Sequence, residues 1–168
     1  TAFAAANPAQ LRAVVSTLAT ETDIILLDSP AAIGSKSAVL PIILADRIIV
    51  VVQPTVPSLS DGLKVQEYAH SYKTETAGVI FNRVRQDESV ATIAEQASRY
   101  FGGPILAHVP ERDVVRAARR QGEPLLAHAP DDIAASAFRE AAASLEINDK
   151  TANAVANRFK SAVIPEQP

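Results

Sequence analysis

Four short groups of polar residues stand directly after apolar runs of this sequence, and their side chains could bind a ligand. The groups are Asp28-Ser29-Pro30, Gln53-Pro54-Thr55, Asn82-Arg83 and Pro110-Glu111-Arg112. An aspartate can hold the water shell of Mg²⁺, because this hard ion prefers oxygen ligands. An asparagine amide offers both a donor and an acceptor to the edge of a ligand. For both residue types the alternative is local turn chemistry, in which the side chain bonds to nearby backbone.

The apolar runs before these groups are predicted to be buried strands. Short unbroken runs of branched residues are typical of strands covered on both faces in a parallel sheet, and they occupy residues 24–27, 48–52, 77–81 and 104–107. Apolar residues at helical spacing predict helices at about residues 8–18, 37–45, 58–72, 88–101, 113–121 and 131–145. Asn7 suits the start of the first helix, and Asp131 and Asp132 suit the start of the last.

Strands that alternate with helices predict an α/β fold, with a doubly wound, mostly parallel sheet and helices on both faces. Ligands of such sheets bind beyond the carboxyl ends of the strands. We therefore expect the four polar groups to lie on one edge of the sheet and to form one site.

The composition excludes several kinds of site. The chain of 168 residues has no cysteine, which excludes disulfides, thiolate metal ligands and cysteine nucleophiles. A net charge of -3 gives no general attraction to nucleic acid, so nucleic acid is not an expected partner. No apolar run is long enough to cross a bilayer, and we expect a cytoplasmic protein. The chain begins at Thr1 and contains no methionine, which we interpret as a fragment or processed form.

The order of these motifs resembles the MinD/ParA family of P-loop ATPases. DIILLDSPAA, which ends at Ala32, is similar to the Walker B and switch II segment of that family. ADRIIVVVQP, which ends at Pro54, and GVIFNRV, which ends at Val84, resemble two of its later strands. VPE, which ends at Glu111, and the following QGEPL resemble the loop that closes over the base. The resemblance covers about residues 9–145.

The resemblance implies ATP and Mg²⁺ as cofactors. Asp28 corresponds to the Walker B aspartate, which holds Mg²⁺ through water in that family. The resemblance also implies a switch II made of Pro30, Ala31 and Ala32. The residues expected on the adenine side of the site are Asn82, Arg83, Pro110, Glu111 and Arg112. The resemblance also implies a homodimer in the complete protein and a regulatory protein partner.

The chain departs from the family pattern at three places. The glycine-rich KGGxGKT loop is absent, and since its backbone N–H groups cradle the phosphates, we expect this chain to be inactive by itself. Ala32 stands where relatives have the switch glycine. Arg112 replaces the usual aspartate after Pro-Glu.

Two regions are expected along the chain. Residues 1–145 are predicted to form the C-terminal part of a MinD/ParA-like nucleotide-binding domain, and residues 146–168 a polar, poorly ordered tail. In the tail, Val155, Phe159 and Ala162 or Val163 share one helical side, with two cations opposite. This pattern weakly resembles the family's amphipathic membrane anchor and implies peripheral contact with the inner face of the cell membrane.

The function implied by the resemblance is an ATPase that positions the division site or a cellular cargo and switches by ATP-dependent dimerisation. The alternative is a non-catalytic half-domain or degenerate paralogue that acts as a protein-interaction adaptor. A reading frame that continues upstream into a phosphate-binding loop favours the enzyme. A flavodoxin-like regulatory module is a third class, and it lacks support because no acidic cluster follows the first strand.

Overall fold

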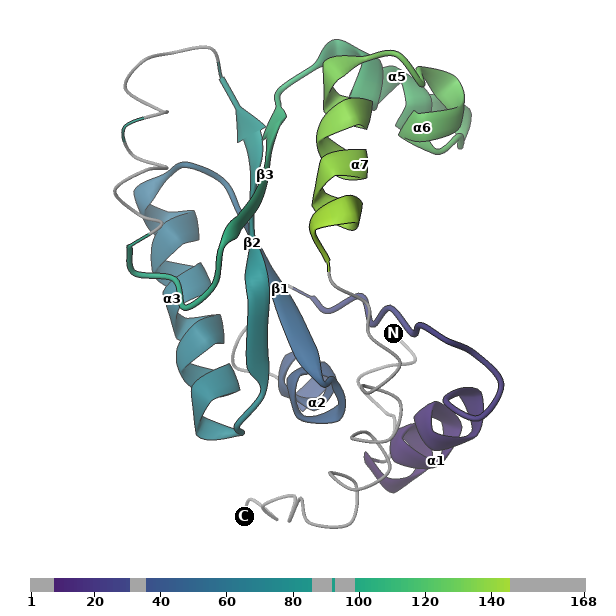
Figure 1. Ribbon diagram of the computed structural model, residues 1–168, viewed down its shortest axis with the longest axis vertical. Helices are drawn as coiled ribbons and strands as arrows, with labels where there is room; N and C mark the ends of the chain where they lie inside the picture. Colours follow the sequence, from purple (N-terminus) through teal and green to yellow (C-terminus); the bar gives the residue numbers. More distant parts are fainter. Residues whose placement is uncertain (1–7, 31–35, 86–91, 93–98, 146–168) are drawn as a thin grey trace. The chain divides into compact units, whose positions relative to one another are not determined.

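The computed structural model describes residues 8–30, 36–85, 92 and 99–145 (Figure 1). The described residues belong to two compact units. The first contains residues 8–30, 36–48 and 68–75, and the second contains residues 49–67, 76–85, 92 and 99–145.

A three-stranded sheet in the order β1-β2-β3 organises the fold. Its strands are β1 (Arg47–Val52), β2 (Glu75–Val84) and β3 (Ile105–Pro110). β2 and β3 pair in parallel, with Val79 opposite Ile105 and Phe81 opposite His108. The sequence predicted all three strands, and it predicted the α/β class with parallel pairing, which the structure confirms. β2 and β3 continue further than predicted, because pairing extends to Val84 and Pro110.

One face of the sheet in the second unit packs against α7 (Ile133–Ser144). Ile80, Ala107 and Val109 of the sheet are buried together with alanines of the helix. The helix buries Ala134, Ala137 and Ala141, spaced three and four residues apart on one side. Small side chains on that side allow the helix backbone to approach the strands closely. This contact forms the core beneath the carboxyl ends of β2 and β3.

The other face is covered by α3 (Val56–Ser71), so helices lie on both sides of the sheet as predicted (Figure 1). Gly62 of α3 faces Val52 of β1. A Cβ at Gly62 would lie 2.5 Å from Val52 Cγ1 and 3.1 Å from the ring of Phe101. A Cβ here would force a neighbouring side chain to shift, so the glycine allows α3 to approach β1 closely.

Two shorter helices connect β3 to α7. α5 (Asp113–Gln121) begins and ends at the predicted residues, and Gly122 ends it in the left-handed conformation at φ 72°. The Glu123 N–H closes the turn on the Ala118 carbonyl at 3.0 Å, as glycine-terminated helices commonly do. α6 (Leu125–His128) was not predicted, since a helix of four residues has no measurable apolar period.

The first unit contains α1 (Pro8–Leu18), α2 (Lys36–Leu44) and the turn that follows α3. Leu40, Ile42 and Leu44 of α2 are buried. Thr74 is buried as well, and its hydroxyl donates to the Ile42 carbonyl at 2.8 Å. That bond satisfies a polar group that would otherwise lose its water on burial.

One strand prediction is wrong: residues 24–27 have no regular secondary structure. Leu26 is 84% exposed and Ile24 is 52% exposed, although both are branched apolar residues. The physical reason is the lack of a partner, because a strand needs hydrogen bonds from a neighbour and this segment is not part of the described sheet. The helix predicted at about residues 88–101 falls almost entirely outside the described residues.

Candidate functional site

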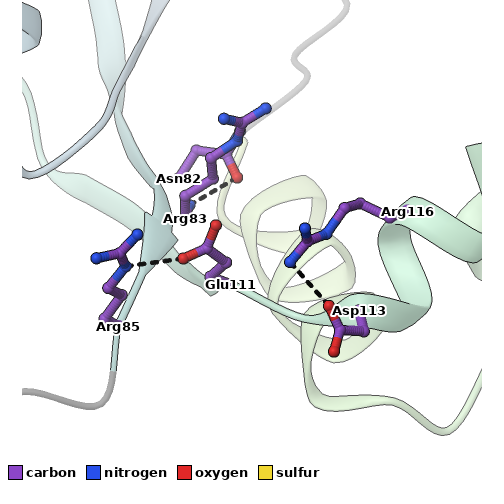
Figure 2. A network of polar contacts seen from close by, with 6 residues as sticks. All are labelled: Asn82, Arg83, Arg85, Glu111, Asp113 and Arg116. Carbon is purple, nitrogen blue, oxygen red and sulfur yellow. Dashed lines mark hydrogen bonds and ion pairs between the residues drawn. The ribbon is translucent and has the colours of Figure 1, made fainter.

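The carboxyl ends of β2 and β3 bring two of the predicted polar groups together (Figure 2). Asn82 lies opposite Val109, and Val84 lies opposite Pro110. The backbone N–H of Glu111 then donates to the Val84 carbonyl at 2.9 Å. Parallel pairing therefore places Asn82 and Arg83 beside the loop formed by residues 110–112, which we call the strand-end loop.

A bulge in β2 shapes this edge. Two steps along β2, from Asn82 to Val84, correspond to one step along β3, so Arg83 is the extra residue. Its φ of 56° lies in the left-handed region, which is energetically unfavourable for any residue that has a Cβ atom. The side-chain oxygen of Asn82 accepts the Arg83 N–H at 2.9 Å. Local turn chemistry, the alternative for Asn82, is therefore present, and it fixes the amide at the strand end.

The carboxylate of Glu111 is paired with an arginine, Arg85 (Figure 2). Arg85 donates from Nε to Glu111 Oε2 at 2.9 Å. This hydrogen bond is the main reason why the pKa of Glu111 lies below its ordinary value. Partial burial raises the pKa, and the charges of Arg85, Arg116 and Arg83 lower it further. Arg116 is itself paired with Asp113 at 2.8 Å. Arg85 thus stabilises the charged form of the Glu111 carboxylate.

Arg112 is directed to the start of α7. Its Nη2 and Nε lie 3.2 Å and 3.3 Å from Asp132 Oδ2. Asp132 Oδ1 accepts the Ala134 N–H at 2.9 Å, so the same carboxylate caps α7, as predicted for this residue. The bond from Ala134 is the largest cause of the lowered pKa of Asp132, burial opposes it, and Arg112 reinforces it. The residue that departs from the family pattern therefore joins the strand-end loop to α7.

The group after β1 forms a turn into α3. The Gln53 N–H donates to the Ser58 hydroxyl at 2.9 Å, and the Thr55 N–H donates to the Gln53 carbonyl at 2.8 Å. Pro54 is buried between them. This group belongs to the same unit as Asn82 and Glu111, and its bonds are those of a turn.

Asp28 belongs to the first unit, where it lines an open hollow of about 210 Å³. The other lining residues are apolar: Leu11, Leu26, Leu27 and Pro41. Asp28 is exposed, as are Ser29 and Pro30, and the Ser29 hydroxyl donates to the Ala38 carbonyl at 3.3 Å. Ala31 and Ala32 lie outside the described residues. The expected convergence of Asp28 with the other three groups stays a prediction.

Sequence reasoning missed Arg85 and the pairing of Arg112 with Asp132. Arg85 comes directly after β2, and its position was the only signal that could have indicated it. Among the described residues, no group of three or more His, Asp or Glu side chains is placed to hold a metal ion. None of the helices described is long and apolar enough to span a bilayer.

In parallel α/β sheets, ligands bind beyond the carboxyl ends of the strands, and the polar residues of β2 and β3 are gathered at those ends. Residues 14–160 match the family model of 4Fe-4S iron sulfur cluster binding proteins, NifH/frxC family. The chain therefore belongs to this family of P-loop ATPases, among its MinD/ParA-like members.

The similar proteins support this placement. The chain is 36% identical to an uncharacterized ATP-binding protein of Methanocaldococcus jannaschii, over 85% of this chain and 53% of the relative. The structure of the cell division ATPase MinD of Pyrococcus furiosus matches with a TM-score of 0.74 and 26% identity, over 84% of this chain and 59% of that one. The septum site-determining protein MinD of Pyrococcus horikoshii, complexed with Mg-ADP, matches with a TM-score of 0.72 and 29% identity, over 89% and 60%.

Two facts limit what this chain supplies. It spans about half the length of the curated relatives it matches, between 39% and 53%. It also contains no cysteine, so none of its residues can give a thiolate to the cluster in the family's description. The residues of this chain do not fit an iron–sulfur cluster.

Proposed function

We propose that this chain is the C-terminal part of a MinD/ParA-type ATPase that switches by ATP-dependent dimerisation. One observation carries the proposal: Asn82, Arg83 and the strand-end loop converge at a sheet edge in a chain whose fold matches a MinD complexed with Mg-ADP. The switch would position the division site or a cellular cargo. The proposed partners are a second copy of the protein and a regulatory protein.

We propose that Asn82, Arg83 and the strand-end loop bind the base end of a nucleotide. Asn82 presents an amide at the strand end, where its oxygen already accepts the Arg83 N–H and fixes its orientation. Arg83 and Pro110 lie beside it at the edge of the same two strands. An amide in a fixed orientation can distinguish the donor and acceptor pattern of one base from another. We propose that these residues select adenine.

The phosphate end needs residues that this sequence does not contain. A glycine-rich phosphate loop is absent from it, and the proposed role of Asp28 is to hold Mg²⁺ through water beside the phosphates. Pro30, Ala31 and Ala32 would form the switch that follows Asp28. When bound, Mg²⁺ would supply charge neutralisation for phosphoryl transfer, and Asp28 would be the residue that holds it through water.

The test uses the full-length protein and measures ATP hydrolysis. Asp28→Ala should abolish turnover while circular dichroism shows an unchanged fold, because an exposed carboxylate contributes little to packing. Asp28→Asn should also abolish ATP turnover, since the amide keeps the shape of the side chain and loses its charge. A folded Asp28→Ala protein with the parent rate would mean that Asp28 only caps a turn.

A second measurement tests the base end. Asn82→Ala should raise the KM for ATP and relax the preference for ATP over GTP, and kcat should stay near the parent value. The 168-residue chain by itself should bind Mg-ATP no tighter than about 1 mM by calorimetry, because it has no phosphate cradle. Micromolar binding by this chain would contradict the proposed need for that cradle.

The sequence also supports a second candidate, a non-catalytic adaptor that binds partners through the MinD-like surfaces. A full-length protein that does not hydrolyse ATP, and that binds a partner protein equally well with and without ATP, would establish this function. We place the protein in the cytoplasm, with peripheral membrane contact through residues 146–168 as a further part of the proposal.

A further inference from the structure

Both charged side chains of the strand-end loop are engaged by the protein itself. Glu111 binds Arg85, the first residue after β2, and Arg112 binds Asp132 at the start of α7. The two ion pairs join the loop to different elements: one joins it to the residue after β2, and the other joins it to the start of α7. The loop is therefore held at both of its charged positions.

Glu111 is attached to the end of β2 by two different bonds. Its backbone N–H donates to the Val84 carbonyl, and its side chain accepts from Arg85 Nε, each at 2.9 Å. Both the backbone and the side chain of Glu111 are therefore bonded to the end of β2. In Figure 2, the Arg85 and Glu111 side chains point toward each other from the two strand ends, with Asn82 and Arg83 beside them.

The charge at Glu111 gives a reason for this pairing. A carboxylate and a guanidinium attract each other strongly at hydrogen-bond distance, whichever ligand binds at this edge. Arg85 supplies the compensating charge through a direct hydrogen bond, which is stronger than a neutral one. The side chain of Arg85 is 77% exposed and that of Glu111 is 32% exposed, so the bond lies where salt can screen it.

We propose that Arg85 is a positioning residue for the nucleotide site: it orients Glu111, and Glu111 acts on the ligand by holding the strand-end loop and not by touching the base. This inference rests on the proposed function. It assigns a role to a residue that the family resemblance did not indicate, and it changes the expected role of Glu111.

A double-mutant cycle in the full-length protein tests the proposal. Calorimetry with ADP and Mg²⁺ compares the parent with Arg85→Gln, Glu111→Gln and the double variant. Each single change should weaken ADP binding about threefold, the size expected for losing one exposed ion pair. The double variant should be no weaker than either single one, because all three remove the same bond. The differences should shrink in high salt.

Lys64→Gln is the matched control, since Lys64 forms an exposed 2.9 Å ion pair with Asp61 on α3, away from the strand ends. It should bind ADP like the parent. All variants should unfold at nearly the parent temperature, because both members of the Arg85–Glu111 pair reach solvent.

Three results would overturn the proposal. A loss with Glu111→Gln far greater than with Arg85→Gln would show that Glu111 touches the ligand. Additive losses would show that the two residues act separately, and parent-like binding by all variants would show that the pair has no role. If the parent itself fails to bind ADP, the proposed function is wrong, and the positioning role is wrong with it.

Discussion

Two apolar runs of the same character end up in opposite environments. Residues 24–27 and residues 77–81 are both short, apolar and uninterrupted by charge. In the second run Val79 and Phe81 are completely buried. In the first, Leu26 is 84% exposed. The sequences of the two runs do not explain this difference.

The difference lies in the neighbours. β2 is the central strand of its sheet, with β1 and β3 on its two sides and helices over its faces (Figure 1). Residues 24–27 form no strand of that sheet. An apolar run thus indicates that a segment can form a buried strand, and the neighbouring strands and helices determine whether it does.

The largest expected effect contrasts one residue from each run. Phe81→Ala should lower the free energy of unfolding by about 3–5 kcal/mol, because it opens a cavity in a closed core. Leu26→Ala should change it by less than about 0.5 kcal/mol, as for other surface substitutions. Urea denaturation of the two variants of this chain measures both values. Similar losses in the two variants would mean that residues 24–27 are buried in solution.

A smaller effect tests how closely β3 approaches the buried run. At Gly78 a Cβ would lie 2.5 Å from Leu106 Cγ and 2.7 Å from the Pro104 carbonyl oxygen. Gly78→Ala should therefore cost about 1–3 kcal/mol, the range for overpacked cores. Gly102→Ala is the control, because the nearest atom there is the flexible end of Gln66. An equal cost for both would indicate a general effect of replacing glycine.

The start of α7, which covers the buried run, gives a pH-dependent effect. The pKa of Asp132 is lowered from 3.8, chiefly by the Ala134 N–H. A carboxylate with a lowered folded-state pKa stabilises the protein fully above the unfolded-state value and loses this contribution as the pH falls through the folded-state value.

Asp132→Ala should lower the urea midpoint at neutral pH, and Asp132→Asn should lower it less, since asparagine also caps helices but loses the charge that pairs with Arg112. Below about pH 4, the usual carboxylate range, the parent should approach the stability of the Ala variant. A midpoint in the parent that stays constant through this acid range would show that the Asp132 charge does not contribute.

The smallest effect on stability concerns the exposed run. Leu26→Ser should leave the free energy of unfolding within about 0.5 kcal/mol of the parent. It should reduce self-association of this chain, because exposed apolar side chains favour association. Sedimentation velocity over a concentration series measures the change, with Val56→Ser, at a position that is 77% exposed on α3, as control. Equal reductions would mean that the association is not specific to residues 24–27.

The sequence predicted the periodic elements well, because their patterns are local. α5 has the predicted bounds, and the three strands of the sheet occur where apolar runs were seen. The bulge at Arg83 could not be predicted, since a left-handed arginine depends on how β2 pairs with β3. The bond between Arg85 and Glu111 joins residues 26 positions apart, and a sequence shows charges without showing which of them meet.

Part of the candidate site was predicted in the same way. Asn82 and the strand-end loop meet because parallel strands end at the same edge, a rule that needs only the order of the elements. Arg112 stands where the family pattern has an aspartate, and it pairs with Asp132, 20 positions away. The roles of Asp28, Pro30, Ala31 and Ala32 stay predictions.

The stacking of Phe81 on His108 gives this molecule a built-in spectroscopic probe. The two rings are 5.5 Å apart between centroids and inclined by 11°, with Phe81 buried and His108 exposed. The ring current of a phenylalanine shields protons above its face, so the imidazole protons of His108 should resonate upfield of those of His70 and His128. His108 lies two residues before Pro110, and a ligand that moves the strand-end loop would change this shift. Ligand binding at the strand ends could then be followed by NMR without any label.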